Sequence, residues 1–262
     1  HEDLGRYYGW LIAFMGSMMG VVFSDHLITL FIFWELTSVT SFFLIGFWSD
    51  REAAIYGSQK ALLITGGGGL AMLAGFLLLG QATGEWQLSK LIAMPGVSEK
   101  VTLAAFILII MGAATKSAQW PFHIWLPNAM EAPTPISAFL HSATMVKAGI
   151  YLLSRFYPIL GGHPAWGYVV ISLGMTTMIT GGLLSLRAHD LKAILAYGTI
   201  SQLGLIVTFL GYGGEEAIIG STLHLYNHAA AKAAMFMIVG IIDHETGTRD
   251  VRLLGHLSRK MP

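Results

Sequence analysis

The sequence predicts an all-α fold, a polytopic transmembrane helix bundle of about eight spans in which one helix is broken by proline. Three observations support this fold class. Hydrophobic residues make up 54% of the chain and charged residues only 11%, whereas soluble domains usually carry about 25% charged residues. The mean hydropathy is +0.63. Apolar runs of about 20 residues, the helix length that crosses ~30 Å of hydrocarbon, recur along the chain.

The predicted spans follow one another closely. They occupy residues 8–23, 27–47, 54–79, 101–120 with a broken extension to 130, 135–153, 166–186, 193–212 and 217–242. Most connections are short polar segments without room for a soluble domain, and the longer connection 81–100 could lie on the surface as a helix. We therefore expect one membrane domain, residues 1–262. A start at His1 and no secretory signal favour an internal fragment of a longer chain.

Lysine and arginine are divided unequally between the two sides of the predicted bundle. Positive residues near the ends of spans stay on the cytoplasmic side of a membrane. The poorer side has Lys90, Lys100 and Arg155. The richer side has Arg6, Arg51, Arg187, Lys192, Arg249, Arg252, Arg259 and Lys260. We therefore expect the amino end of the chain to be cytoplasmic.

The third predicted span contains four consecutive glycines, residues 66–69. Glycine weakens a helix in water by about 1 kcal/mol per residue. In a membrane, small residues let neighbouring helices approach closely. We therefore expect tight helix packing at this point.

Residues 111–151 form the centre of the predicted bundle. Lys116 directly follows an apolar run, and prolines come after it at positions 121, 127, 133 and 135. Proline removes a backbone donor and clashes with the carbonyl four residues earlier, so the helix must break near Pro121. Inside hydrocarbon such a break is tolerated only where the freed carbonyls face protein or a wet cavity. We therefore expect water near Lys116.

Two ionisable residues in the first half of the chain are candidates for function, because a charge at the bilayer centre costs several kcal/mol. Glu35 lies near the middle of the second span, and Lys116 lies at the predicted break. A proton relay is the functional interpretation, since burial favours a neutral lysine and a nearby carboxylate a charged one. The alternatives are a static ion pair for Glu35 and, for Lys116, a side chain that extends to the membrane interface.

His141 and Lys147 share the span that follows the break. They are six residues apart, which on a regular helix leaves them about 120° apart around the axis. A proton could not pass directly between them along one helix face. Water, or the hydroxyls of Ser142 and Thr144, would have to join them.

The last span carries His224, His228 and Lys232 at intervals of four residues, so the three share one helical stripe. Histidine titrates near neutral pH and can relay protons. The alternatives are histidines that only pack in the core, a zinc site that still lacks a third ligand, and a haem held by His141 with His224.

Composition and motifs exclude several other classes of function. The 15 Lys and Arg balance the 15 Asp and Glu, so the chain lacks the basic excess of a nucleic-acid-binding protein. There is no Cys, which excludes disulfides, thiolate metal sites and iron–sulfur ligation within the chain. Motifs for binding nucleotides and dinucleotides or for serine hydrolysis are missing. We therefore expect no cofactor and no nucleic-acid partner.

Three segments resemble the antiporter-like membrane subunits shared by respiratory complex I, membrane-bound hydrogenases and the Mrp cation/proton antiporters. They are KSAQWPFHIWLPNAMEAPTPISAFLHSATMVKAG (116–149), HDLKAILAYGTISQLG (189–204) and HLYNHAAAKAAMFM (224–237). Within this set the sequence is most similar to the A-type member of the Mrp antiporters. One reason is Lys147, where the large distal subunit of complex I tends to have a neutral residue.

The resemblance implies a role for each charged position. The glutamate of the family's FWE motif corresponds to Glu35 and the lysine of its broken helix to Lys116, and the remaining family positions match His141, Lys147, His224, His228 and Lys232. Family members are built from two inverted half-channels of five spans each, joined by a central hydrophilic axis. The second broken helix and its terminal lysine would lie beyond residue 262.

The resemblance also implies a cellular setting. It indicates a proton-translocating subunit of a multisubunit Na⁺/H⁺ antiporter in the prokaryotic plasma membrane, with no chemical catalysis of its own. Its partners would be the lipid bilayer, the other membrane subunits of the complex, Na⁺ and H⁺. The alternatives are a proton-pumping subunit of complex I, which would make the chain part of an NADH:quinone oxidoreductase, or of a related hydrogenase, a structural membrane subunit, and a haem-carrying cytochrome.

Overall fold

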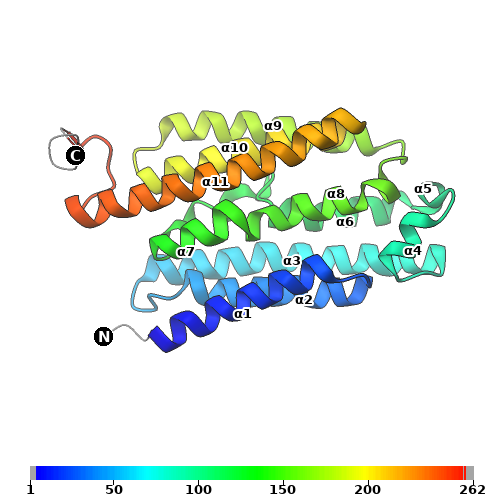
Figure 1. Ribbon diagram of the computed structural model, residues 1–262, viewed down its shortest axis with the longest axis horizontal. Helices are drawn as coiled ribbons and strands as arrows, with labels where there is room; N and C mark the ends of the chain where they lie inside the picture. The colour runs from blue at the N-terminus through cyan, green and yellow to red at the C-terminus, as the bar shows by residue number, and fades with distance from the viewer. Residues whose placement is uncertain (1–3, 256, 258–262) are drawn as a thin grey trace.

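The computed structural model describes residues 4–255 and 257, which fold into an elongated bundle of α-helices (Figure 1). Arg259 and Lys260, which we assigned to the cytoplasmic side, lie outside the described residues. The helices are α1 (Leu4–Phe23), α2 (Leu27–Ile45), α3 (Glu52–Thr83), α4 (Leu88–Ala93), α5 (Val97–Lys100), α6 (Leu103–Lys116), α7 (Thr134–Ala138), α8 (Ala148–Leu160), α9 (Trp166–Arg187), α10 (Leu191–Tyr212) and α11 (Glu215–Thr246).

The predicted fold class is confirmed, and each predicted apolar run is helical over most of its length. Among the described residues, six helical stretches are long and apolar enough to cross a membrane, namely Leu27–Ile45, Glu52–Thr83, Thr134–Leu160, Trp166–Arg187, Leu191–Tyr212 and Glu215–Thr246. The run at 101–120 gives a shorter helix, α6, of 14 residues. The first run forms α1, which is not among the six.

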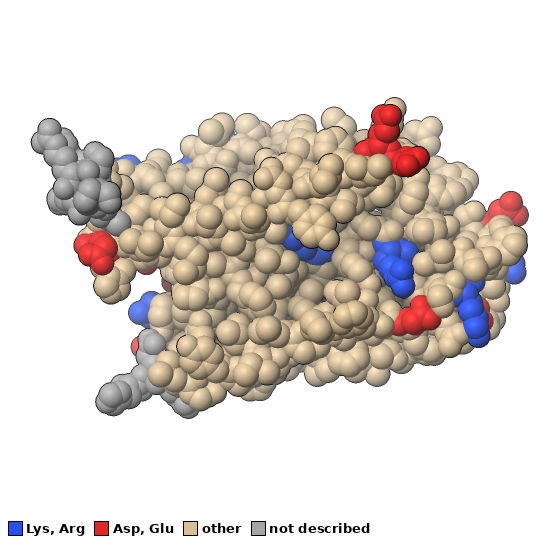
Figure 2. Space-filling view, in the orientation of Figure 1, with Lys and Arg blue, Asp and Glu red and all other residues tan. Residues whose placement is uncertain are grey.

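The helices form three groups that run side by side along the bundle. In Figure 1, α1, α2 and α3 make one side, α9, α10 and α11 make the other, and α6, α7 and α8 lie between them. Helices α9 and α10 pack along each other, as do α3 and α6. Among the six candidate spans, the stretch Thr134–Leu160 of the middle group is the most buried. Most charged side chains visible in Figure 2 lie toward the two ends.

The break predicted near Pro121 is confirmed, although the helix already ends at Lys116. Two short 3₁₀ turns, Phe122–Trp125 and Asn128–Glu131, follow Pro121. The side chain of Trp125 donates to the carbonyl of Thr115 at 2.9 Å, and that of Gln119 donates to the carbonyl of Ser117 at 3.0 Å. Side chains of the protein thus satisfy carbonyls that the interrupted helix leaves free, as a low-dielectric interior requires.

The next span contains a second interruption that sequence reasoning missed. Between α7 and α8 the chain forms a π turn, Phe139–Ala143, and a 3₁₀ turn, Met145–Lys147. Thr144, between them, has φ −123° and ψ −88°. The expected angle of about 120° between His141 and Lys147 assumed a regular helix, and that assumption is wrong.

The glycines at 66–69 lie where α3 meets α2 and α6, which supports the tight-packing interpretation. A Cβ atom at Gly68 would overlap the side chain of Thr115, and one at Gly69 would overlap the carboxylate of Glu35. Gly67, by contrast, faces no atom within 4 Å. Two of these glycines therefore bring helix α3 against the residues beside Lys116 and against Glu35.

We predict that Gly68→Ala destabilises the protein and that Gly67→Ala does not. An added methyl at Gly68 must displace the buried Thr115, and overpacking of this kind costs about 1–3 kcal/mol. The same methyl at Gly67 meets open space and improves helix propensity by up to about 1 kcal/mol. Thermal unfolding of the full-length protein in detergent measures both, and equal midpoints for the two variants would contradict this packing of α3 against α6.

Candidate functional site

Lys116 is the most enclosed charged side chain of the predicted site. It is the last residue of α6 and is 0% exposed. Its Nζ donates to Ser38 Oγ at 2.7 Å and to the carbonyl of Trp34 at 3.2 Å, and lies 5.3 Å from the centre of the Trp34 ring. Full burial contradicts the alternative in which Lys116 extends to the membrane interface.

Glu35 lies on α2 between the two residues that accept hydrogen bonds from Lys116. It is half-buried against the α3 glycines, and its Oε1 has no hydrogen-bond partner among the described residues. Its carboxylate interacts electrostatically with Lys116, yet the pair is absent from the ion pairs within 4.0 Å in the described part of the chain. The charges of Glu35 and Lys116 therefore influence each other without a direct salt bridge between the two side chains.

Lys147 and the stripe on α11 form a second cluster. Lys147 is 6% exposed, and its Nζ lies 2.8 Å from Nδ1 of His228. The ring centres of His228 and His224 are 6.4 Å apart, and His224 Nε2 lies 2.7 Å from the amide oxygen of Gln202. Lys232 donates to the carbonyl of Leu195 at 3.1 Å. The predicted stripe therefore faces α10 and the 3₁₀ turn Met145–Lys147 that precedes α8.

His141 lies in the π turn, 0% exposed. Neither ring nitrogen has a hydrogen-bond partner within the described ranges. The expected bridge through Ser142 and Thr144 is not formed, because these hydroxyls donate to the backbone carbonyls of Ala138 and Phe139. An unpaired buried polar atom costs about 1–3 kcal/mol, so water would bind favourably beside this ring.

The segments that carry Lys116 and Lys147 are in direct contact. Ser117, next to Lys116, donates from Oγ to the carbonyl of Val146, next to Lys147, at 2.6 Å. A Cβ atom at Gly149 would overlap the carbonyl of Ala113, so α8 begins tightly against the end of α6. The two interruptions therefore lie side by side in the middle group of helices.

Sequence reasoning did not foresee the burial of Lys192. This residue, in the first turn of α10, was counted only among the positive residues of the expected cytoplasmic side, but it is 2% exposed. It acts electrostatically on His141. The signal that could have found it is its place in the segment HDLKAILAYGTISQLG, one of the three that carried the family resemblance.

The metal alternatives find no support in the same geometry. Within the described ranges, no three His, Cys, Asp or Glu side chains gather in a way that could hold a metal ion. His224 contacts Gln202, and His228 contacts Lys147. Each of the two histidine rings thus contacts a hydrogen-bonding side chain, as a proton relay requires.

A family profile described as NADH:quinone oxidoreductase/Mrp antiporter, TM, matches residues 24–262. The chain belongs to this family. It is 51% identical to the A subunit of the Na⁺/H⁺ antiporter of Alkalihalophilus pseudofirmus over 100% of the chain and 34% of that protein. It is 50% identical to the A/B subunit of a probable K⁺/H⁺ antiporter of Rhizobium meliloti, over 100% of the chain and 26% of that protein.

Solved structures agree with this family membership. The Mrp complex from Dietzia sp. DQ12-45-1b matches with a TM-score of 0.93 and 43% identity, covering 98% of this chain and 28% of the other. The archaeal membrane-bound sulfane sulfur reductase matches with a TM-score of 0.88 and 26% identity, over 96% and 52%. This antiporter-family chain is thus a multi-pass membrane protein that spans about a third of the first curated relative's length.

We predict that Ser38→Ala destabilises this family member more than Ser41→Ala does. The first change removes the closer of the two acceptors of Lys116, and an unpaired buried donor costs about 1–3 kcal/mol. Ser41 is also buried, but its hydroxyl donates only to the backbone carbonyl of Ser38 on the same helix. Denaturation of the purified full-length protein compares the two, and an equal loss would argue against the Lys116 contact.

Proposed function

We propose that the chain is a proton-translocating part of a multisubunit cation/proton antiporter and that it relays protons through buried side chains. The cation in this proposal is Na⁺, as in the printed name of the Alkalihalophilus relative. The relay consists of Glu35, Lys116, His141, Lys147, His224, His228 and Lys232. The other subunits of the complex are its partners.

One observation carries the proposal, namely the direct contact of Lys147 with His228 inside a membrane bundle. Their nitrogens lie 2.8 Å apart although the residues are 81 positions apart in the chain. An amine and an imidazole in such a hydrogen bond can exchange a proton without moving either backbone. Two positive charges at this distance in a low dielectric repel each other strongly. The pair is therefore more stable with one positive charge, on either Lys147 or His228, than with two.

In the first half of the relay, the charge of Glu35 influences the protonation of Lys116. Lys116 donates to neutral oxygens of Trp34 and Ser38, so it can lose its proton without breaking an ion pair. The nearby carboxylate of Glu35 favours the charged form of Lys116, and burial favours the neutral form. A change in the charge of Glu35 therefore shifts the proton occupancy of Lys116.

The second half carries the proton toward α10 and α11. His141, within the second interruption, offers two ring nitrogens that have no hydrogen-bond partner among the described residues. From Lys147 the proton passes to His228, whose ring centre is 6.4 Å from that of His224. Lys232, held by the carbonyl of Leu195, ends the described row. Water fills the remaining steps, because separations beyond about 3.5 Å need a bridging molecule.

A proton-pumping subunit of an oxidoreductase is the second candidate function, since the same family includes such proteins. Sequence identity favours the antiporter. It is 51% to the Alkalihalophilus antiporter protein, but 26% to the sulfane sulfur reductase chain. Subunits that copurify with the full-length protein separate the two candidates, because redox subunits would indicate the oxidoreductase.

We predict that Glu35→Ala and Lys116→Ala each lower Na⁺/H⁺ exchange by about 100-fold, the usual scale for loss of a proton-transfer group. Exchange is measured in inverted membrane vesicles as sodium-driven collapse of a proton gradient, with assembly checked by copurification. Glu216→Gln, an exposed change in the first turn of α11, serves as the control. Wild-type rates in both alanine variants of the assembled complex would refute the roles of Glu35 and Lys116 in the relay.

A further inference from the structure

Trp34 lies beside both members of the first half of the relay, although it is not itself a member. It is on α2 directly before Glu35, and its side chain is 0% exposed. Lys116 reaches it from α6, 82 positions away in the chain. A large aromatic side chain enclosed beside a buried acid and a buried amine can influence the charge of both.

Two different parts of Trp34 face the ammonium group of Lys116. The backbone carbonyl accepts a hydrogen bond from Nζ at 3.2 Å, and the centre of the indole ring lies 5.3 Å from the same nitrogen. The face of an indole carries a negative electrostatic potential and attracts a cation within about 6 Å of the ring centre. This attraction is strongest where water is excluded, and Lys116 is 0% exposed. Trp34 therefore favours the charged form of Lys116 without carrying a charge itself.

The indole N–H of Trp34 lies near Glu35. Nε1 of Trp34 and Oε1 of Glu35 are both buried, and neither has a hydrogen-bond partner among the described residues. A Cβ atom on Gly69 of α3 would overlap this carboxylate oxygen and would lie 3.2 Å from Cδ1 of Trp34, the ring atom bonded to Nε1. The unpaired donor and the unpaired acceptor thus flank the same point of α3. A water molecule that accepts from Nε1 and donates to Oε1 would pair both atoms, which are costly to bury unpaired.

Trp34 and Glu35 act on Lys116 in different ways. Glu35 loses its attraction for the ammonium when its carboxylate takes up a proton. The ring and the carbonyl of Trp34 do not titrate, so their attraction for the ammonium stays the same in every state of the relay. Trp34 thereby preserves part of the proton affinity of Lys116 when Glu35 is neutral.

We propose that Trp34 is a positioning residue of the relay, which holds the protonated form of Lys116 with its ring face and carbonyl and the ionised form of Glu35 with its indole N–H through one water. Without Trp34, burial would drive Lys116 to its neutral form whenever Glu35 is protonated, and proton transfer through Lys116 would slow. This inference rests on the proposed function and adds to it a residue that sets how strongly the two ionisable groups influence each other.

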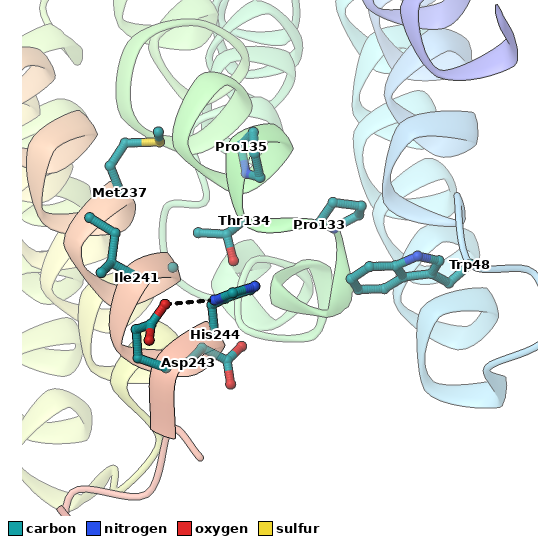
Figure 3. Close-up of a pocket in the computed structure, with 10 residues that line it drawn as sticks. Trp48, Pro133, Thr134, Pro135, Met237, Ile241, Asp243 and His244 are labelled. Carbon is teal, nitrogen blue, oxygen red and sulfur yellow. Dashed lines mark hydrogen bonds and ion pairs between the residues drawn. The ribbon is translucent and has the colours of Figure 1, made fainter. Parts of the chain in front are cut away.

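A second tryptophan offers a matched control. Trp48 follows the end of α2, and the guanidinium carbon of Arg51 lies 4.0 Å from the centre of its ring. Figure 3 shows Trp48 lining an apolar pocket of about 540 Å³, with Pro133 next to it and α11 on the opposite side. Arginine keeps its proton in proteins, and neither Trp48 nor Arg51 belongs to the proposed relay. The two tryptophans therefore make the same kind of contact with a cation, one at the relay and one outside it.

The first test weakens the ring face without changing the shape of the side chain. Trp34 is replaced, in the full-length protein within its complex, by tryptophans that carry one, two or three fluorine atoms on the benzo ring. Each fluorine withdraws electrons from the ring face and weakens its attraction for a cation, while it adds little bulk. We expect Na⁺/H⁺ exchange in inverted vesicles to fall stepwise with the number of fluorines, to about a tenth of the wild-type rate with three, the scale of a desolvated cation–π contact.

The trifluorinated residue at position 48 is the control for this series, and we expect it to leave the wild-type rate unchanged. Mass measurement confirms incorporation, and copurification confirms assembly of the complex. A rate that stays level or rises across the series at position 34 would overturn the role of the ring. An equal fall at position 48 would also overturn it, because it would show a general effect of fluorination.

The second test removes the indole N–H alone. Benzothienylalanine at position 34 has sulfur in place of the N–H and keeps a fused aromatic ring of nearly the same size. We expect exchange to fall about 5-fold or more, the equilibrium effect of leaving a buried acceptor unpaired. We also expect the infrared carboxyl band of Glu35, identified by its absence in Glu35→Ala, to change frequency, because its hydrogen bonding changes. An unchanged band in the assembled variant would overturn the role of the N–H.

The outcomes also distinguish this inference from the proposed function. Wild-type exchange in every Trp34 variant, together with lost exchange in Lys116→Ala, would discard the role of Trp34 and leave the relay in place. Intact exchange in Lys116→Ala would discard the relay itself. Should the benzothienylalanine variant fail to assemble, the fluorine series decides the proposal by itself, because it keeps the size and the N–H of the native side chain.

Discussion

Hydrogen bonds from buried lysines to uncharged oxygens are the interaction on which the rest of this structure depends. Lys116 donates to the Trp34 carbonyl, Lys192 to the Ala132 carbonyl, and Lys232 to the Leu195 carbonyl. The carbonyls of Trp34 and Leu195 belong to the continuous helices α2 and α10, and that of Ala132 lies just before α7. A buried ammonium needs acceptors, and these backbone carbonyls supply them without adding a charge.

The proposed relay requires these lysines to change protonation, and neutral partners favour that. In the described part of the chain, the ion pairs within 4.0 Å involve loops and helix ends, such as Arg249 with Asp190. A buried salt bridge must repay the desolvation of two ions, and removing one charge then leaves the other stranded. A carbonyl acceptor imposes no such cost when the proton leaves. The buried lysines are therefore suited to the proton transfer that we propose, whereas the peripheral ion pairs are suited to anchoring loops and helix ends.

Close helix packing serves the same arrangement. Gly69 allows α3 to approach Glu35, and Gly149 allows α8 to begin against the end of α6. Gly198 leaves room for the Lys232 ammonium, which would lie 2.9 Å from a Cβ atom at that position. Small residues therefore bring separate helices close enough for their charged groups to interact, which side chains of ordinary size would prevent.

The sequence by itself determined the helical membrane class, the break after Lys116 and the stripe of His224, His228 and Lys232, because run length, proline and four-residue spacing are local properties. Only the tertiary structure decided the contact of Lys147 with His228 and the burial of Lys192. The first joins residues 81 positions apart. Lys192 resembles any lysine at a span end until the loop carrying Met130 and Ala132 folds over it. Long-range packing chooses such partners, and no periodicity in the chain encodes it.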